Sequence, residues 1–193
     1  MAAVRMRSFW IYMGVSPTVG KGWCTWLVYA IFATVGYLRY YIDKWLHFFA
    51  AHSRHGTHSP FVYRLVDEVI YAKRLPGEPR DKVQRLIGRL IHRFQPGMVF
   101  MLTNKPIPTT TLDFVIIDAD ALEAPAAQVA AFWPQLHAGS VLVLLDVYRT
   151  AESKTLWRSI KMKPEVTVTI DMYRMGLVFF RSGQAKEGFK IRY

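Results

Sequence analysis

The pattern of hydrophobic and polar positions changes near Pro96, and the change divides the chain into two kinds of sequence. Before Pro96, apolar side chains recur at every third or fourth position, which is typical of amphipathic helices. After it, short continuous apolar runs are bounded by Gly, Pro and Asp, which is typical of strands buried in a parallel sheet. The sequence therefore predicts helices first and an α/β arrangement afterwards.

Two amphipathic helices are predicted before Pro96. The pair Ser59-Pro60 predicts a helix start, with Ser59 as the N-cap and Pro60 at the first helical position. The second helix is predicted from Asp81 to about Phe94, after a turn that contains Pro and Gly. On its polar side an arginine recurs at every fourth position, at Arg85, Arg89 and Arg93. We interpret this arginine row as a solvated face in preference to a phosphate clamp.

Three buried parallel strands are predicted after Pro96, at residues 98–102, 113–118 and 141–145. One helix is predicted between the second and third strands, and another over about residues 150–160. Two further apolar runs, 166–170 and 176–180, flank a short connection, as the strands of an antiparallel hairpin do. Strands and helices in this order predict an α/β fold with a mixed sheet.

The composition fits a folded domain with a basic surface. The chain has 193 residues, of which 52% are hydrophobic, enough to form a core. Its formal net charge of +11 favours anionic partners, yet the basic residues are scattered and form no nucleic-acid-binding signature. We therefore expect no nucleic-acid partner. The single cysteine, Cys24, excludes an internal disulfide and a multi-cysteine metal site, and favours a reducing cytoplasmic setting.

The segment from Gly22 to Leu38 holds 17 residues without a charge and has basic residues on both sides. A membrane-spanning helix needs roughly 20 apolar residues, so the segment lies at the lower limit of length. Three interpretations stay open: a membrane anchor or interfacial helix, a helix buried against the domain or a partner subunit, and a poorly ordered extension. We expect a protein on the cytoplasmic side, with membrane contact through residues 22–38 as one of these alternatives.

Three histidines follow at equal spacing, His52, His55 and His58. Histidine is a common metal ligand, but Gly56 and the Ser59-Pro60 pair break any continuous helix, so the three rings need not share a face. No cysteine and no ordered acidic ligand lies nearby in the sequence. We therefore predict no metal site.

Five stretches of the chain resemble one protein family. They are SRHGTHSPFVYRLVDEVIY, LIGRLIHRFQP, DFVIIDAD, LHAGSVLVLLDVYRT and PEVTVTIDMYRMGLVFFRSGQAKEGFKIRY. Together they are similar to a family of class I S-adenosylmethionine-dependent methyltransferases found in Bacteroidetes-type bacteria. The resemblance runs from about Tyr37 to Tyr193, in two blocks, and implies a bacterial protein with a Rossmann-like sheet.

The chain departs from this family between the two blocks. In the family, the first strand runs into an acidic-Leu-Gly-x-x-x-Gly turn that cradles the cofactor, and two further βα units follow. Here only the ten residues Thr103–Leu112 separate the strands that resemble the family's first and fourth strands. A parallel βα unit needs roughly 30 residues, so these two units are missing.

The prediction is an α/β fold with a truncated Rossmann-like methyltransferase sheet. The sheet is mixed, ends in a C-terminal antiparallel hairpin, and is preceded by an N-terminal helical extension. Residues 1–50 are predicted to be a hydrophobic and aromatic helical segment, and residues 51–193 a degenerate methyltransferase-like domain.

The resemblance directs attention to the strand ends, where open α/β sheets bind ligands. The family's Asp-Gly-x-His and Asp-Asp-Ile-His motifs stand here without their histidines, as Asp118–Ala121 and Leu145–Tyr148. The residues with candidate roles are Asp118 and Asp120 for cofactor binding, Asp146 and Tyr148 for catalysis, and His55 and His58 for a substrate or partner contact. For Asp118 and Asp146 we favour an interpretation as strand-end caps and turn formers.

We expect a methyltransferase-like protein without catalytic activity or cofactor, kept as a binding or structural subunit at a membrane or in a protein complex. Loss of half the sheet would expose an edge of the first remaining strand. Residues 20–50, a protein partner or a second copy in an oligomer would cover that edge.

Two other hypotheses stay open. The first is an active methyltransferase in which a rearranged site holds S-adenosylmethionine or substrate through Asp118, Asp120, Asp146 and Tyr148. The second is a basic protein that binds a membrane surface or nucleic acid and has no relation to methyl transfer.

Overall fold

The computed structural model describes residues 38–51, 59–103 and 106–193. The chain divides into two compact units, Met1–Tyr41 and Ile42–Tyr193, and the α/β fold lies in the second. The domain boundary that we placed between residues 50 and 51 stays a prediction.

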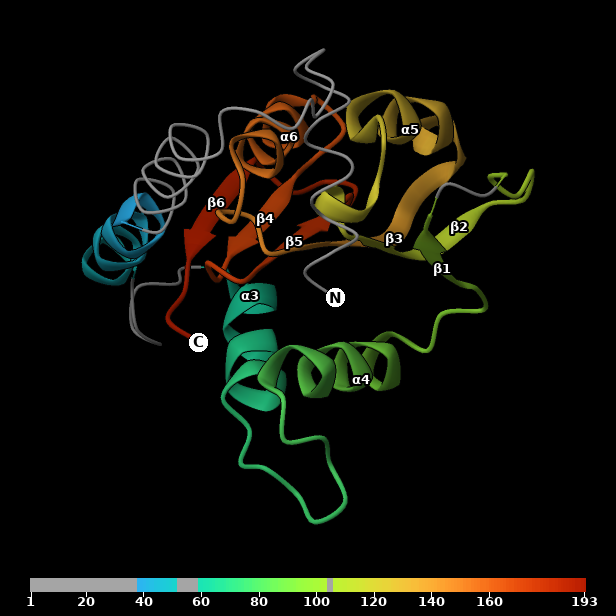
Figure 1. The fold of residues 1–193 in the computed structure, drawn as a ribbon. Coiled ribbons are helices and arrows are strands. Elements are labelled where there is room, and N and C mark those ends of the chain that lie inside the picture. Colours follow the sequence, from blue (N-terminus) through green and yellow to red (C-terminus); the bar gives the residue numbers. More distant parts are fainter. Residues whose placement is uncertain (1–37, 52–58, 104–105) are drawn as a thin grey trace, which may run out of the picture. The chain divides into compact units, whose positions relative to one another are not determined.

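One six-stranded mixed sheet forms the centre of the second unit, in the order β1-β2-β3-β5-β4-β6 (Figure 1). The strands are β1 (Val99–Leu102), β2 (Leu112–Ile117), β3 (Leu136–Leu145), β4 (Val168–Asp171), β5 (Met175–Phe179) and β6 (Glu187–Lys190). The first three are parallel, β5 is antiparallel to both β3 and β4, and β6 is parallel to β4. The predicted α/β fold, mixed sheet and antiparallel hairpin are confirmed, whereas β6 was not predicted.

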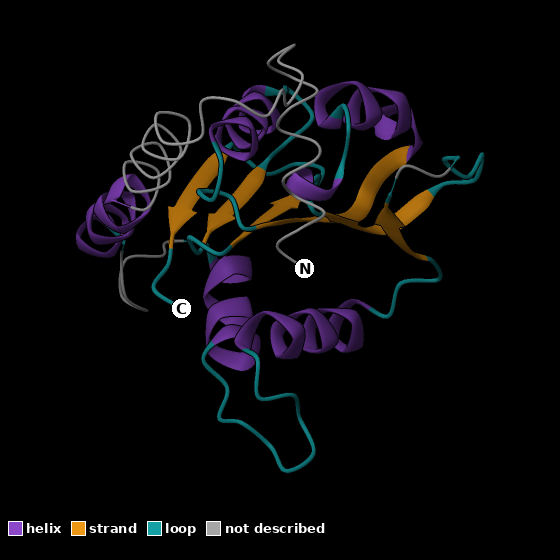
Figure 2. Ribbon diagram, in the orientation of Figure 1, coloured by secondary structure: helices purple, strands orange, loops and turns teal. Residues whose placement is uncertain are grey.

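Helices cover both faces of this sheet (Figure 2). One face is covered by α3 (Pro60–Leu65), its π-helical continuation η2 (Val66–Ile70) and α4 (Lys82–Phe94). The other face is covered by α5 (Pro125–Phe132) and α6 (Ala151–Met162), together with the 3-10 turns η3 (Ala119–Ala121) and η4 (Trp133–Gln135). A hydrophobic core lies on each face of the sheet, and neighbouring residues of β2 point into different cores. Phe114 belongs to the core that includes α3 and α4, and Val115 belongs to the core that includes α5 and α6. Residues 114–117 of β2 are buried on both faces of the sheet and form a continuous apolar run in the sequence.

The two helix starts predicted before Pro96 are confirmed, although only one of these two has a side-chain cap. Asp81 caps α4, since its carboxylate accepts hydrogen bonds from the backbone N–H groups of Val83 and Gln84. Ser59 lies at the N-cap position of α3, but its hydroxyl makes no cap bond there. It accepts a hydrogen bond instead from the side-chain amide of Gln184, at 3.0 Å, and so links α3 to the chain just before β6.

One member of the arginine row of α4, Arg89, departs from the solvated face that the sequence predicts, whereas Arg93 is half exposed. Arg89 has only 13% of its side chain exposed and forms two hydrogen bonds to the carboxylate of Glu78, at 2.7 and 2.6 Å. Its guanidinium also donates to the backbone carbonyl groups of Val69, Ala72 and Lys73. A guanidinium offers five donors in a rigid fork, so Arg89 holds α4 against the loop that precedes it.

The first strand is not buried as predicted. In the described part of the chain β1 pairs with β2 alone and forms one edge of the sheet. Val99 is 45% exposed and Met101 is 53% exposed, while Leu102, at the end of the strand, is buried. An edge strand lacks a neighbour on one side, which leaves backbone and side-chain groups accessible to another chain.

Residues 42–50 are helical and lie near the opposite edge of the sheet. Lys154 of α6 forms an ion pair with Asp43 at 2.7 Å, and Arg192, which follows β6, donates to the carbonyl oxygen of Phe48 at 3.0 Å. This part of the predicted covering segment 20–50 therefore packs beside β4 and β6 and does not cover β1. Residues 20–37 lie outside the described part of the chain.

The segment 22–38 also falls outside the described part, except for Leu38. Among the helices of residues 38–51, 59–103 and 106–193, none combines the length and the hydropathy that a membrane crossing requires. Membrane contact through residues 22–38 stays a prediction.

Candidate functional site

The carboxyl ends of β2 and β3 bring three of the predicted site residues to one edge of the sheet. β2 ends at Ile117 and β3 at Leu145, so Asp118 and Asp146 follow directly after parallel neighbouring strands. Arg149 connects the two loops, because its guanidinium lies 3.3 Å from Asp120 and 3.3 Å from Asp146. The sequence therefore predicts correctly that these aspartates gather at the carboxyl ends of the strands. The chemistry available there depends on what each carboxylate contacts.

Asp118 acts as a turn former. Its carboxylate accepts a hydrogen bond from the backbone N–H of Asp120 at 3.3 Å and occupies the N-cap position of η3. This is the local side-chain-to-backbone contact that Asp makes in turns. The interpretation of Asp118 as a strand-end cap is confirmed.

Asp120 connects η3 to the start of α6. One of its carboxylate oxygens accepts hydrogen bonds from the hydroxyls of Thr150 and Ser153, both at 2.9 Å, and its side chain is only 12% exposed. Thr150 is also the N-cap of α6, since its hydroxyl oxygen accepts from the backbone N–H of Ser153 at 3.1 Å. With the nearby guanidinium of Arg149, these contacts occupy the carboxylate that the resemblance assigns to the cofactor.

Asp146 lies in a charged network at the surface. Its backbone has a φ of 43°, in the left-handed region, and its N–H donates to the carbonyl of Arg174 at 2.7 Å. Its carboxylate lies 3.3 Å from Arg149 and 3.7 Å from Arg174. Asp146 therefore turns the chain after β3 and balances two arginines, as expected for a strand-end turn former.

Tyr148 does not join these carboxylates, because its hydroxyl points to a different residue. It donates to the carboxylate of Asp171 at 2.6 Å, the shortest of the four hydrogen bonds that this carboxylate accepts from described residues. Asp171 is the last residue of β4 and is only 3% exposed. Its other donors are His47 at 2.9 Å, the indole N–H of Trp157 at 3.2 Å and the backbone N–H of Tyr173 at 3.1 Å.

Four donors around one buried carboxylate determine its ionisation. Burial raises the pKa of Asp171, but the hydrogen bonds from His47 and Tyr148 outweigh burial, so its pKa lies below its usual value of 3.8. Burial also raises the pKa of Tyr148 far above its usual value, and the negative charge of Asp171 raises it further. Asp171 is therefore the charged acceptor, and Tyr148 is a neutral donor.

The network around Asp171 fastens a helix to the sheet. His47 belongs to the helical residues 42–50, is only 6% exposed, and packs edge-on against the rings of Tyr148 and Tyr173. Those two tyrosine rings stack on each other at 5.0 Å. A histidine, a carboxylate and a tyrosine are groups that general acid–base catalysis uses, but here each contacts the others and is covered by packed rings. The arrangement favours a structural role.

Sequence reasoning missed His47 and Asp171. The two residues lie 124 positions apart, and no motif spacing connects them. One signal was present: Asp171 ends a short apolar run, as Asp118 and Asp146 do. The pattern could have marked a third strand-end aspartate, but its burial and its partner arise only from the fold.

The remaining predicted site residues, His55 and His58, lie outside the described residues. Within residues 38–51, 59–103 and 106–193, no group of three or more His, Cys, Asp and Glu side chains is placed to hold a metal ion.

Comparison with known proteins assigns no family to this chain. No family model, no curated protein and no solved structure matches it. The resemblance to the methyltransferase family stays a prediction that rests on the sequence motifs.

Proposed function

We propose that this chain is a methyltransferase-like protein that does not transfer methyl groups and acts as a binding or structural subunit of a protein complex. The observation that carries the proposal is the occupation of the strand-end carboxylates by the protein's own donors. Asp120 accepts from Thr150 and Ser153, and Asp146 faces two arginines.

A bound adenosyl group would need different surroundings at this edge. In nucleotide-binding α/β proteins, a carboxylate accepts hydrogen bonds from the ribose hydroxyls, and a glycine-rich turn lets the backbone approach the ligand. The residues between β1 and β2 contain no glycine, and Arg149 lies between Asp120 and Asp146. These residues do not fit S-adenosylmethionine, so we derive no catalytic step through it.

The exposed edge at β1 supports a role in an assembly. Val99 and Met101 are among the exposed large hydrophobic residues of the described chain, on a strand with a single neighbour there. Soluble proteins protect such edges with charge, proline or a covering element. A protein partner, or a second copy of the chain, would extend the sheet or cover this edge.

Calorimetric titration of the full-length protein with S-adenosylhomocysteine tests the loss of catalysis. The proposal expects no heat of binding at millimolar ligand. Micromolar affinity would overturn it and would favour an active enzyme with a rearranged site. If the ligand does bind, the Asp120→Asn variant shows where: a loss of the affinity for S-adenosylhomocysteine in this variant would place the ligand at the strand ends.

The assembly role has a separate test. Met101→Lys introduces a charge on β1 at a residue that is 53% exposed in the described chain. We expect this variant to stay folded but to elute as a smaller species in size-exclusion chromatography with light scattering. Met162→Lys is the matched control, because Met162 is 80% exposed at the end of α6, away from the sheet edge. Equal molecular masses in solution for the unaltered protein, Met101→Lys and Met162→Lys would contradict self-association through β1.

A further inference from the structure

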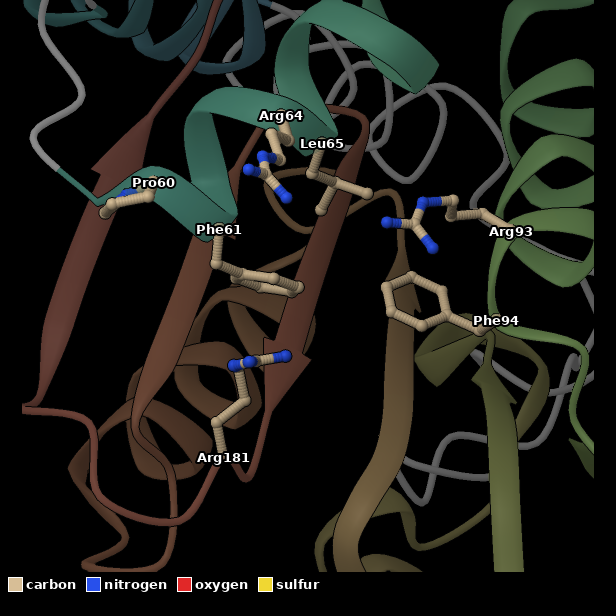
Figure 3. A pocket seen from close by; sticks show the side chains of 7 residues that line it. All are labelled: Pro60, Phe61, Arg64, Leu65, Arg93, Phe94 and Arg181. Carbon is tan, nitrogen blue, oxygen red and sulfur yellow. The ribbon is translucent and has the colours of Figure 1, made fainter.

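We propose that the cavity beside α3 and α4 binds a small aromatic phosphate, meaning a phosphate ester attached to a planar ring. The cavity has a volume of about 550 Å³ and is open to solvent. It is lined by Pro60, Phe61, Arg64, Leu65, Arg93, Phe94 and Arg181 (Figure 3). Binding sites for small molecules in proteins have volumes of roughly 300–1,000 Å³ and combine apolar walls with a few polar groups. The site lies on the α3–α4 face and shares no residue with the strand-end carboxylates.

Aromatic rings form the apolar part of the cavity. Phe61 and Phe94 line it, and both contact Phe179 of β5, with ring centroids 5.1 and 5.7 Å from that ring. Phe179 is only 1% exposed, so the two outer rings are supported by the core of the sheet. A planar ring in the cavity would meet other rings at the offset or edge-on geometries that aromatic pairs prefer.

Three arginines from three different elements supply positive charge around these rings. Arg64 comes from α3, Arg93 from α4 and Arg181 from the loop after β5. In Figure 3, Arg64 and Arg181 lie on opposite sides of the Phe61 ring, and Arg93 extends from α4 toward α3. The guanidinium of Arg181 lies 4.1 Å from the centroid of that ring. Guanidinium groups bind phosphate oxygens through two parallel hydrogen bonds, which makes arginine the usual choice for such ligands.

The charges at the cavity are only partly balanced by the protein. Glu68 lies 4.0 Å from Arg93, and both side chains are about half exposed. Among the described residues, no carboxylate forms an ion pair with Arg64 or Arg181. The cavity therefore keeps an excess of two positive charges, which a phosphate dianion would neutralise. The apolar rings select for a ligand with a planar body over a bare inorganic ion.

Phenyl phosphate is a suitable probe, because it joins one ring to one phosphate dianion. We expect isothermal titration into the full-length protein, at low salt, to give a single site. Inorganic phosphate and phenol, titrated separately, should each bind at least about tenfold more weakly, since each keeps only half of the contacts. Inorganic phosphate that binds as tightly as phenyl phosphate would overturn the assignment of an aromatic ligand. No heat at millimolar phenyl phosphate would overturn the site.

Charge-removing variants locate the site. Arg64→Gln and Arg93→Gln should each weaken phenyl phosphate binding by about tenfold, the usual effect of losing one charge-assisted hydrogen bond. Arg158→Gln removes the same charge from an exposed position on α6, across the sheet, and should bind like the unaltered protein. Equal weakening by Arg158→Gln would show that the probe responds only to the net charge of +11, and would refute the proposal.

The aromatic contact has its own variant. Phe94→Leu keeps an apolar side chain at the cavity but removes the ring, so it should weaken phenyl phosphate and leave inorganic phosphate unchanged. Circular dichroism of each variant verifies that the fold is intact. The proposal does not depend on the strand-end carboxylates. A titration with S-adenosylhomocysteine tests the carboxyl ends of the strands, and a titration with phenyl phosphate tests the cavity beside α3 and α4.

Discussion

Replacement of Asp171 by asparagine is the sharpest test of the buried network. Asparagine has almost the same volume, but it carries one acceptor oxygen and one NH₂ group in place of two acceptor oxygens. In the unaltered protein, one carboxylate oxygen accepts from His47 and the Tyr173 N–H, and the other accepts from Tyr148 and the Trp157 N–H. Either orientation of the amide therefore turns an NH₂ group toward two donors.

The magnitude follows from which donors can adapt. The Tyr148 hydroxyl can rotate, and His47 can change its tautomer, so each can accept from the new NH₂ group. The N–H groups of Trp157 and Tyr173 cannot, so one buried N–H loses its acceptor in either orientation. With the charge assistance of the other bonds also lost, we expect the free energy of unfolding to fall by about 2–4 kcal/mol, a large share of the roughly 5–15 kcal/mol typical of a domain.

Urea denaturation followed by circular dichroism at pH 7 measures this loss. Tyr148→Phe is the matched comparison: it removes one donor and leaves Asp171 with three, so it should cost only about 1–2 kcal/mol. A third variant, Asp118→Asn, keeps a side chain able to cap η3 and should change stability by less than about 0.5 kcal/mol. The reasoning is refuted if Asp171→Asn costs no more than Asp118→Asn.

The same network has a defined pH dependence. Because the pKa of Asp171 is lower in the folded protein than its usual value of 3.8, its charge contributes stability above about pH 4. That contribution is lost as the pH falls through the folded-state pKa. The difference in unfolding free energy between the unaltered protein and Asp171→Asn should therefore shrink steadily below pH 4. A difference that stays constant between pH 6 and pH 2 would show that folding does not change the pKa of this carboxyl, and would refute the reasoning.

Gly176→Ala should destabilise the protein by about 1–3 kcal/mol in urea denaturation, because a Cβ there would lie 2.7 Å from the Trp157 ring; a neutral result would mean that this ring can move away. Gly88→Ala should stabilise it by about 0.5–1 kcal/mol in the same assay, since Gly88 lies inside α4 with nothing within 4 Å of the added carbon. The hydrogen bond from Arg89 lowers the pKa of Glu78 to about 2, so Glu78→Gln should reduce the melting temperature at pH 6 more than at pH 2, where the unaltered carboxylate is half protonated. Equal reductions at both pH values would mean that the charge of Glu78 contributes nothing to stability.

Local sequence patterns predicted most elements of the sheet half because each element is encoded over a few adjacent residues. Residues 114–117 of β2 form a continuous apolar run because both faces of the strand are buried there, and Asp81 begins α4 because its side chain satisfies two N–H groups. The exposure of β1 was not predictable in this way. Its residues Val99–Leu102 resemble those of a buried strand, and only the strand order places them at an edge.

The strand β6 was missed because its pattern carries too little signal. Glu187–Lys190 contains one large apolar residue, Phe189, between a glycine and a lysine. Such a segment becomes a strand because β4 offers a row of backbone donors and acceptors beside it, in the register Val168 to Glu187. Pairing of this kind depends on the neighbour and not on the segment itself.

Local patterns along the chain were enough to predict the helix periods, the apolar strands and the place of Asp118, Asp120 and Asp146 at or just after strand ends. The contacts of these carboxylates, and the whole role of Asp171, arise from the fold. Asp120 and Asp146 contact the chain's own hydroxyls and guanidinium groups, and Asp171 is buried against a histidine 124 positions away. The physical reason is that spacing along the chain encodes local geometry, whereas the chemistry of a carboxylate depends on its burial and its donors, which distant segments supply.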